Sequence, residues 1–151
     1  MGHTYSNLQY HIVSSTKQRA PLIRPDLRAR LDSYIGGIVR EAGGTLLSAG
    51  GIEDHSHWLV SARPDTAPSD LVRAIKAKSS GWIHETYPEL RDFQWQAGYS
   101  IFSVSKSRED AVRQYIDGQV EHHKKQTFLE ELAALLEKHG VPFDPRYLGA
   151  D

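Results

Sequence analysis

Alternating hydrophobic and polar positions mark four extended segments along the chain. In the first, Leu8, Tyr10 and Ile12 recur at every second residue, which is the spacing of one face of a β-strand. The second and third segments are separated only by Gly51-Ile-Glu-Asp54, and this predicts an antiparallel hairpin. The four predicted strands cover residues 8–15, 45–51, 55–62 and 99–104.

Apolar residues at helical spacing mark a helix over 26–41. Leu27, Leu31 and Ile35 recur every four residues, so they lie on one side of an α-helix. The pair Gly43-Gly44 follows directly, and glycine is the residue that most often ends a helix. This segment is predicted to be an amphipathic helix.

Three more helices follow. The segment 69–87 repeats the helical period and is closed by Pro88. Two further helices are expected to begin at Ser107 and Thr127, because each hydroxyl is followed three residues later by a carboxylate, as in a capping box. The resulting order is β, α, β, β, α, β, α, α.

This order predicts an α+β fold. Its first six elements are those of a ferredoxin-like βαββαβ unit, an antiparallel sheet with helices on one face, and two C-terminal helices follow. A length of 151 residues suits a single domain. Within it we expect a ferredoxin-like core over 1–105, a helix over 106–126, and a C-terminal helix and tail over 127–151.

Composition narrows the class of protein. Hydrophobic residues make up 39% and charged residues 25% of the chain, which is ordinary for a globular domain. No apolar run of about 18 residues and no signal-peptide layout occurs, so we expect a cytoplasmic protein with no membrane segment. The absence of cysteine excludes disulfides, thiolate zinc sites and a cysteine nucleophile. A metal would need histidine, carboxylate or amide ligands.

The net charge of -1 offers little support for a nucleic-acid partner, because such partners usually select a strongly basic surface. The charge is nevertheless uneven. Residues 1–126 carry 16 basic and 14 acidic side chains, whereas residues 127–151 carry 2 and 5. Contacts with phosphates therefore remain possible along the first part of the chain.

Two histidines occupy alternate positions in the third predicted strand. Because strand side chains alternate, His55 and His57 leave the same face, with Cα atoms roughly 6 to 7 Å apart. Their imidazoles could converge on one metal ion, while Trp58 points to the opposite face. For an isolated His-x-His, hydrogen-bonded histidines on a half-buried strand are the more common interpretation.

The helix from Ser107 carries a polar stripe. Tyr115 and Gln119 are four residues apart, so they share one side of a helix, and His122 or His123 continues the stripe. A hydrophobic stripe of Val112, Ile116 and Val120 is expected beside it. Taken alone, the polar stripe could equally mark the boundary between the buried and exposed sides of the helix.

Four segments together carry a resemblance to a known family: Asn7-Leu-Gln-Tyr-His-Ile-Val13, Gly51-Ile-Glu-Asp-His-Ser-His-Trp-Leu-Val60, Trp95-Gln-Ala-Gly-Tyr99 and Tyr115-Ile-Asp-Gly-Gln119. In this order they resemble the HUH single-tyrosine transposases of the smallest bacterial insertion sequences, whose relatives include the REP-associated tyrosine transposases. The resemblance spans almost the whole chain. One departure is Ser56, where the family usually has a bulky apolar residue. Since Ser56 should face away from the metal, the change concerns packing more than chemistry.

The resemblance implies roles for particular residues. His55, His57 and Gln119 would bind a divalent cation, Mg²⁺ or Mn²⁺, and Tyr115 would be the nucleophile. The implied activity is cleavage and rejoining of single-stranded, hairpin-forming DNA through a 5′-phosphotyrosine intermediate. The implied assembly is a homodimer whose sites combine the histidines of one subunit with the tyrosine helix of the other.

Basic side chains near the expected site are candidate DNA contacts, because phosphate neutralisation dominates nucleic-acid affinity. Each of them could instead be an ordinary solvated charge. The candidates are Lys17, Arg19, Arg73, Lys76, Lys78, Lys106, Arg108, Lys124 and Lys125.

The sequence is compatible with two other interpretations. The order of the first six elements is also that of RNA-recognition motifs, so a noncatalytic single-strand-binding module is possible. However, the third strand has histidines where such modules display aromatics. A domesticated REP-associated relative, which binds DNA without transposing, is the other interpretation.

Overall fold

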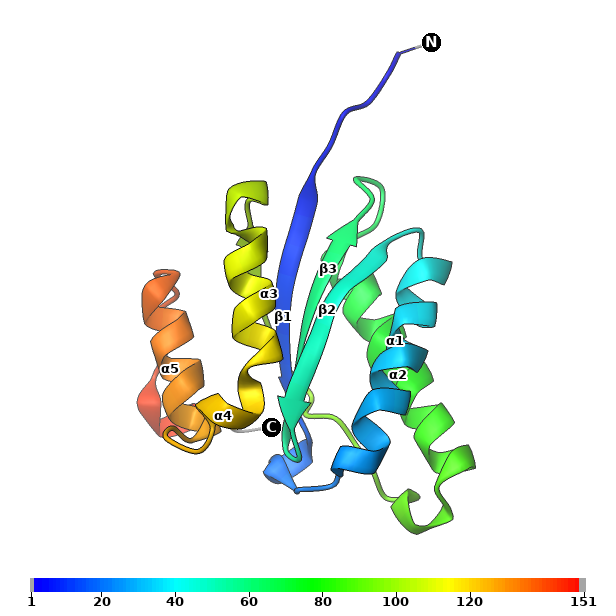
Figure 1. Ribbon diagram of the computed structural model, residues 1–151, viewed down its shortest axis with the longest axis vertical. Helices are drawn as coiled ribbons and strands as arrows, with labels where there is room; N and C mark the ends of the chain where they lie inside the picture. The colour runs from blue at the N-terminus through cyan, green and yellow to red at the C-terminus, as the bar shows by residue number, and fades with distance from the viewer. Residues whose placement is uncertain (1, 150–151) are drawn as a thin grey trace.

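A four-stranded antiparallel sheet lies at the centre of the protein (Figure 1). The structure, a computed structural model, describes residues 2–149. The strand order is β2-β3-β1-β4, and each neighbouring pair is antiparallel. This confirms the ferredoxin-like sheet expected from the order of the elements. The strands are β1 (Leu8–Ser15), β2 (Thr45–Ile52), β3 (His55–Ala62) and β4 (Ser100–Val104).

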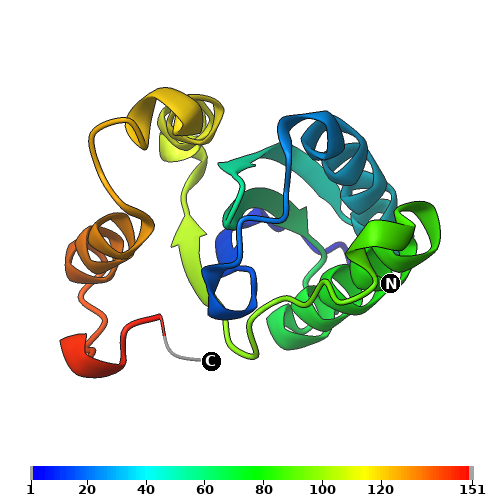
Figure 2. The same cartoon turned by 90° about the horizontal axis from the view of Figure 1, so that it is seen from below.

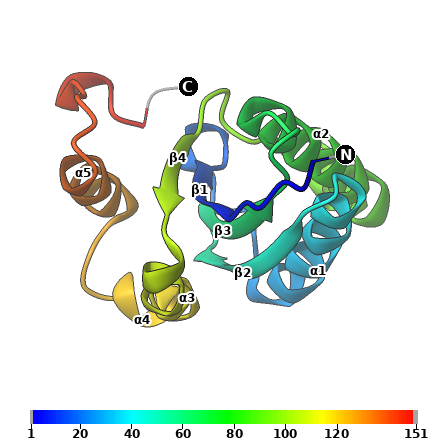
Figure 3. The same cartoon turned by 90° about the horizontal axis from the view of Figure 1, so that it is seen from above.

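Helices cover both faces of this sheet (Figures 2 and 3). One face carries α1 (Pro25–Glu41) and α2 (Pro68–Thr86), and the other carries α3 (Glu109–Asp117), α4 (Gln119–His122) and α5 (Phe128–Lys138). Four short 3-10 segments complete the described chain: η1 (Lys17–Arg19), η2 (Pro88–Leu90), η3 (Lys106–Arg108) and η4 (Pro145–Tyr147). Among residues 2–149, no helix combines the length and apolar character needed to cross a membrane.

The two covered faces bear on the hypothesis of a noncatalytic binding module. RNA-recognition modules stack bases on aromatics that stand on an open sheet surface. Here Trp58 of β3 is fully buried in the core formed with α1 and α2, and the other face lies under α3 and α5 (Figure 3). The described chain therefore lacks the surface on which that hypothesis depends.

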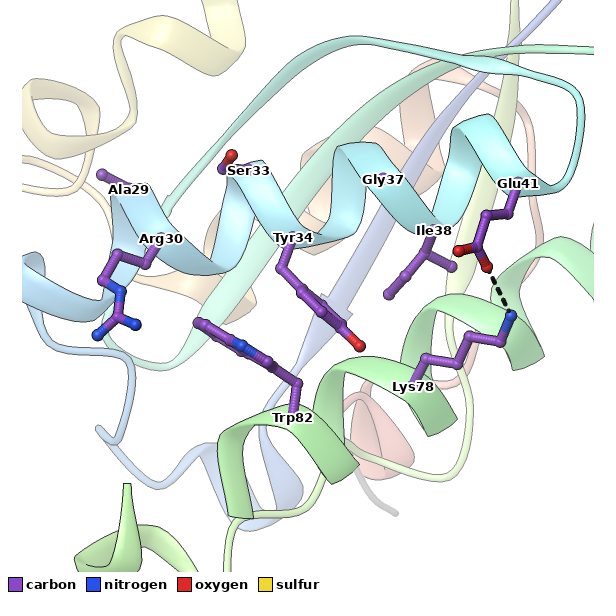
Figure 4. A pocket seen from close by; sticks show the side chains of 9 residues that line it. All are labelled: Ala29, Arg30, Ser33, Tyr34, Gly37, Ile38, Glu41, Lys78 and Trp82. Atoms are coloured by element: carbon purple, nitrogen blue, oxygen red, sulfur yellow. Dashed lines mark hydrogen bonds and ion pairs between the residues drawn. The ribbon is translucent and has the colours of Figure 1, made fainter. Parts of the chain in front are cut away.

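The main hydrophobic core lies between the sheet and the first two helices. Alternate residues of the strands, such as Ile12 and Val60, pack there against Leu27, Leu31 and Ile35, as the helical period predicts. At the outer surface, the rings of Tyr34 on α1 and Trp82 on α2 stack with their centroids 4.8 Å apart. They line a groove between these helices (Figure 4), and these helices cover the face of the sheet opposite the C-terminal helices.

A second, smaller core holds α5 against the opposite face. Phe128, Leu132 and Leu136 of α5 pack on Val13 of β1 and Phe102 of β4. Since the three helix residues repeat every four positions, one side of α5 is committed to the sheet. The predicted C-terminal tail runs to Asp151, and its last two residues lie outside the described range.

The two predicted capping boxes have different outcomes. At the start of α5 the Thr127 side chain accepts from the Glu130 backbone N–H, and the Glu130 side chain accepts from Thr127, which confirms the prediction. The box at Ser107 is wrong, because η3 occupies that position and α3 begins at Glu109 without a side-chain cap.

The helix expected over 106–126 is broken. α3 ends at Asp117, and Gly118 has φ -90° and ψ 13°, a ψ value far from the α-helical one. The prediction that Val120 continues the buried hydrophobic stripe is therefore wrong, since Val120 is 62% exposed. The break turns the chain so that Gln119, 1% exposed, faces the sheet instead.

Glycine lets α3 approach the sheet closely. A Cβ added at Gly50 of β2 would lie 2.6 Å from the carbonyl oxygen of Ile116, a distance that real side chains do not tolerate. The absence of a side chain at Gly50 therefore allows the last turn of α3, which carries Tyr115, to pack closely against β2.

Candidate active site

The histidines of β3 lie on the face covered by the C-terminal helices. His55 and His57 are both 0% exposed, and their ring centroids are 5.1 Å apart. His11 of β1 joins them, because its Nε2 lies 2.8 Å from Nδ1 of His57. Ser56 faces the other way, where its hydroxyl accepts a hydrogen bond from Arg28.

Arg28 of α1 fixes the end of the hairpin from behind. Its NH2 group donates to the carbonyl oxygens of Ile52, at 2.6 Å, and His55, at 2.8 Å. One guanidinium therefore ties the last residue of β2 to the first residue of β3. Since His55 is that first residue, the contact sets the position of a predicted metal ligand.

Helices α3 and α4 bring Tyr115 and Gln119 to the same point. The amide oxygen of Gln119 lies 3.0 Å from Nε2 of His55 and 3.0 Å from Nε2 of His123. The ring of Tyr115 lies 5.7 Å from that of His57, centroid to centroid. The structure thus brings the four residues of the predicted site together within one chain.

A carboxylate that the sequence analysis missed occupies the middle of this group. Glu131 of α5 is 1% exposed, and its Oε1 lies 3.1 Å from Nε2 of His57 and of His123. Its Oε2 accepts hydrogen bonds from the Tyr115 hydroxyl and from the Gln119 amide. One sequence signal could have revealed it, because Glu131 follows Phe128 by three residues and so stands on the hydrophobic side of α5.

Burial sets the protonation of the histidines. It lowers the pKa of His57 to about 4 and that of His11 to about 3, so both rings are neutral near pH 7. Burial also lowers the tendency of His55 to protonate, but its hydrogen bonds with Asp54 and Glu131 outweigh this and raise the pKa of His55. The neutral rings have a nitrogen lone pair available for a metal.

The carboxylate and the phenol affect each other. Burial would raise the pKa of Glu131, but the hydrogen bonds with His55 and His57 dominate and hold this pKa well below the usual range. Burial and the contact with Glu131 raise the pKa of Tyr115. In this arrangement Glu131 is ionised, and Tyr115 is a protonated phenol that donates to it.

The group fits a metal ion. His55, His57, His123 and Glu131 each offer one ligand atom, and these atoms lie within 4.8 Å of one another. The far nitrogens of the histidines are all occupied. Nδ1 of His55 contacts the Asp54 carboxylate, that of His57 contacts His11, and that of His123 contacts the Gln126 carbonyl. This outer hydrogen bonding is typical of histidines that bind metals. The buried group can therefore hold a metal ion.

The candidate DNA contacts on α2 are not brought to this site. Arg73 pairs with Asp70, Lys78 pairs with Glu41 (Figure 4), and Lys76 donates to two backbone carbonyls before β4. Since α2 covers the opposite face of the sheet, these three side chains lie across it from the histidines.

The other candidates lie in η1, in η3 and shortly after α4. Lys17 and Arg19 form part of η1, which begins after Thr16, whose N–H bonds the Asp54 carbonyl. Lys106 and Lys124 form ion pairs with nearby glutamates. Arg108 lines a cleft of about 330 Å³ between α3 and α5, and Lys125 lines a neighbouring surface hollow. Tyr115 borders both hollows.

Comparison with known proteins identifies related chains. Residues 4–119 match the family model described as IS200-like transposase. The ISDra2 transposase TnpA of Deinococcus radiodurans is 28% identical over 123 residues, which cover 78% of this chain and 87% of the relative. The transposase for insertion sequence element IS200 of Salmonella typhimurium is 28% identical over 130 residues, or 82% of this chain and 84% of the relative.

Two solved structures are similar in fold. A crystal structure from Deinococcus radiodurans R1, described as a candidate transposase, superposes with a TM-score of 0.65 at 26% identity, covering 79% of this chain and 96% of that one. A REP-associated tyrosine transposase bound to a REP hairpin superposes with a TM-score of 0.58 at 16% identity, covering 81% of this chain and 73% of that one. With the family model matching most of its length, the chain belongs to the IS200-like transposase family.

Proposed function

We propose that this transposase cleaves and rejoins single-stranded DNA with Tyr115 as its nucleophile and a divalent cation held at His55, His57 and Gln119. One observation carries the proposal. Within a single chain, the histidine Nε2 atoms, the Gln119 amide oxygen and the Tyr115 hydroxyl converge around one buried carboxylate. The proposal accounts for this clustering of the tyrosine with metal-binding groups.

The chemistry follows from the groups present. A bound cation would neutralise phosphate charge and orient the phosphodiester. The Tyr115 oxygen forms the new bond to phosphorus as the bond to the 3′-oxygen breaks, which leaves a 5′-phosphotyrosine and a 3′-hydroxyl. The hydrogen bond from Tyr115 to Glu131 directs the phenol proton to that carboxylate, and the departing 3′-oxygen takes a proton from solvent. Attack by another 3′-hydroxyl reverses the step and joins strands without ATP.

The proposed substrate is single-stranded DNA that forms a hairpin. A transposase of similar fold was solved with a REP hairpin. The cleft between α3 and α5 opens beside Tyr115 and has Arg108 in its lining, so a cationic side chain stands where a phosphate would approach the nucleophile. We further propose that Lys17, Arg19 and Lys125 contact the DNA. Lys17 and Arg19 lie in η1, which follows Thr16 and its hydrogen bond with Asp54. Lys125 lines the second hollow that Tyr115 borders.

A covalent adduct is the expected product when the protein meets labelled hairpin oligonucleotides, drawn from the flanks of its gene, in the presence of Mn²⁺. The adduct should survive denaturant, disappear with EDTA, and map by mass spectrometry to the peptide that contains Tyr115. A heat-denatured sample is the control for nonspecific attachment. Cleavage that leaves no protein on the 5′ end would overturn the tyrosine mechanism and indicate hydrolysis by water.

We propose that a homodimer would carry one complete site in each subunit. The family resemblance implies shared sites, but Tyr115 and His57 of one chain already lie at the same carboxylate. Coexpressed His57→Ala and Tyr115→Phe chains should therefore stay inactive in the adduct assay. Wild type coexpressed with Tyr115→Phe is the control. Its activity should be proportional to the fraction of wild-type chains in the mixture. Recovery of activity in the mixture of the two variants would show that subunits exchange their tyrosine helices.

A further inference from the structure

We propose that Glu131 is itself a ligand of the cation, so that the bound ion ties helix α5 to the sheet. This inference rests on the cation site of the proposed function. It concerns a residue beyond position 119, where the match to the family model ends. The ion would thus be held partly by a segment that this match does not include.

The geometry around the Glu131 carboxylate is that of a ligand set. Its Oε1 lies 3.4 Å from Nε2 of His55, 3.1 Å from that of His57 and 3.1 Å from that of His123. Ligand atoms about 2.1 Å from one ion occupy neighbouring positions roughly 3 Å apart. The observed separations therefore match those of atoms that share a cation.

The hydrogen bonds on the far side of the rings strengthen this assignment. His55 and His123 each face an acceptor oxygen at Nδ1, on Asp54 and Gln126 respectively. An imidazole that donates from Nδ1 presents a lone pair at Nε2. A cation placed between these Nε2 atoms and Oε1 of Glu131 would be coordinated by all of them, because each atom faces the same point.

The same carboxylate connects the ion to the nucleophile. While Oε1 faces the histidines, Oε2 accepts from the Tyr115 hydroxyl and the Gln119 amide. A ligand role for Glu131 would hold the phenol beside the ion in the absence of DNA. Glu131 would thus bind the ion, hold the Tyr115 hydroxyl in place and accept its proton.

A consequence is that α5 should be held in two ways. Phe128, Leu132 and Leu136 pack on the sheet whether or not an ion is present, whereas the bond through Glu131 exists only with the ion. Imidazoles suit transition metals, and carboxylates suit Mn²⁺ and Mg²⁺. A site in which imidazoles act together with a carboxylate should therefore bind Mn²⁺ more tightly than Mg²⁺.

The test measures Mn²⁺ binding by electron paramagnetic resonance on the full chain without DNA. We expect Glu131→Gln to weaken binding at least about tenfold, the loss that follows even from removing groups that only support a ligand. Glu137→Gln is the matched control, because Glu137 lies on the same helix and is exposed. Unchanged affinity in Glu131→Gln would overturn the assignment.

A second measurement needs no variant. Hydrogen exchange of the backbone amides over 128–138 should slow when Mn²⁺ replaces EDTA in the wild-type protein, while exchange in α1 should not change. Equal exchange of α5 in both conditions would contradict the proposal. If wild type binds Mn²⁺ at Glu131 but forms no DNA adduct, the proposed function fails and this inference stands. If the adduct forms but Glu131→Gln keeps full affinity, only the inference fails.

Discussion

Tyr115→Phe is expected to abolish the covalent DNA adduct while leaving the fold and the Mn²⁺ affinity unchanged. The substitution removes only the hydroxyl, so the ring keeps its contacts with a third apolar cluster, which contains Leu59 and Ile116. Glu131 retains the hydrogen bond from Gln119. Loss of a nucleophile typically lowers the rate on the order of 10⁶-fold. Any remaining adduct should therefore be far below the detection limit of a gel assay.

The matched control is Tyr99→Phe. Tyr99 is a partly exposed tyrosine, 38% accessible, on the far side of the sheet beside Lys76, and the variant should form the adduct as wild type does. Thermal unfolding and Mn²⁺ titration of both variants establish that fold and ion binding are intact. An adduct of undiminished yield from Tyr115→Phe would show that another group attacks the phosphate.

Arg28→Met is expected to lower the free energy of unfolding by about 3–5 kcal/mol, the usual effect of leaving a buried charge without its partner. The Arg28 side chain is 15% exposed and pairs with Asp32, which is 17% exposed. It also donates to the carbonyls of Ile52 and His55 and to the Ser56 hydroxyl. A methionine fills similar volume but supplies no donor, so all these acceptors lose a partner.

The loss should depend on pH in a defined direction. Burial raises the pKa of Asp32 to about 6 even with Arg28 beside it, and removal of the guanidinium should raise it further. A carboxyl whose folded pKa lies above its unfolded pKa has no effect on stability at pH values below the unfolded pKa. It destabilises the fold increasingly as the pH rises from there through the folded pKa. The deficit of Arg28→Met should therefore be smaller at about pH 5 than at about pH 7.5.

Urea unfolding at the two pH values measures this effect. Arg30→Met is the control, since Arg30 lies on the same helix but contacts Tyr87 at the surface, and exposed contacts of this kind contribute about 1 kcal/mol or less. Because Arg28 also positions His55, the Arg28 variant should bind Mn²⁺ more weakly than the Arg30 variant. Equal stability of the two variants would show that the hairpin does not depend on the buried guanidinium.

Local periodicity predicted most of the secondary structure. The strands of the ferredoxin-like unit and both of its helices lie within a few residues of the expected positions, because alternation and helical spacing report directly which face of a segment is buried. The same rule placed His55 and His57 on one face of a strand, and Tyr115 and Gln119 on one side of the chain. It failed at Val120, because it assumes an unbroken helix and Gly118 interrupts it.

By itself, then, the sequence determined the order of the elements and which side chains share a face, since these depend on neighbours a few residues apart. Only the tertiary structure decided that Glu131 and His123 join the histidines of β3, and that Arg73 and Lys78 lie across the sheet from them. The reason is physical. Glu131 and His57 are separated by 74 positions, and no local period specifies a contact that arises only when a later helix packs on an earlier strand.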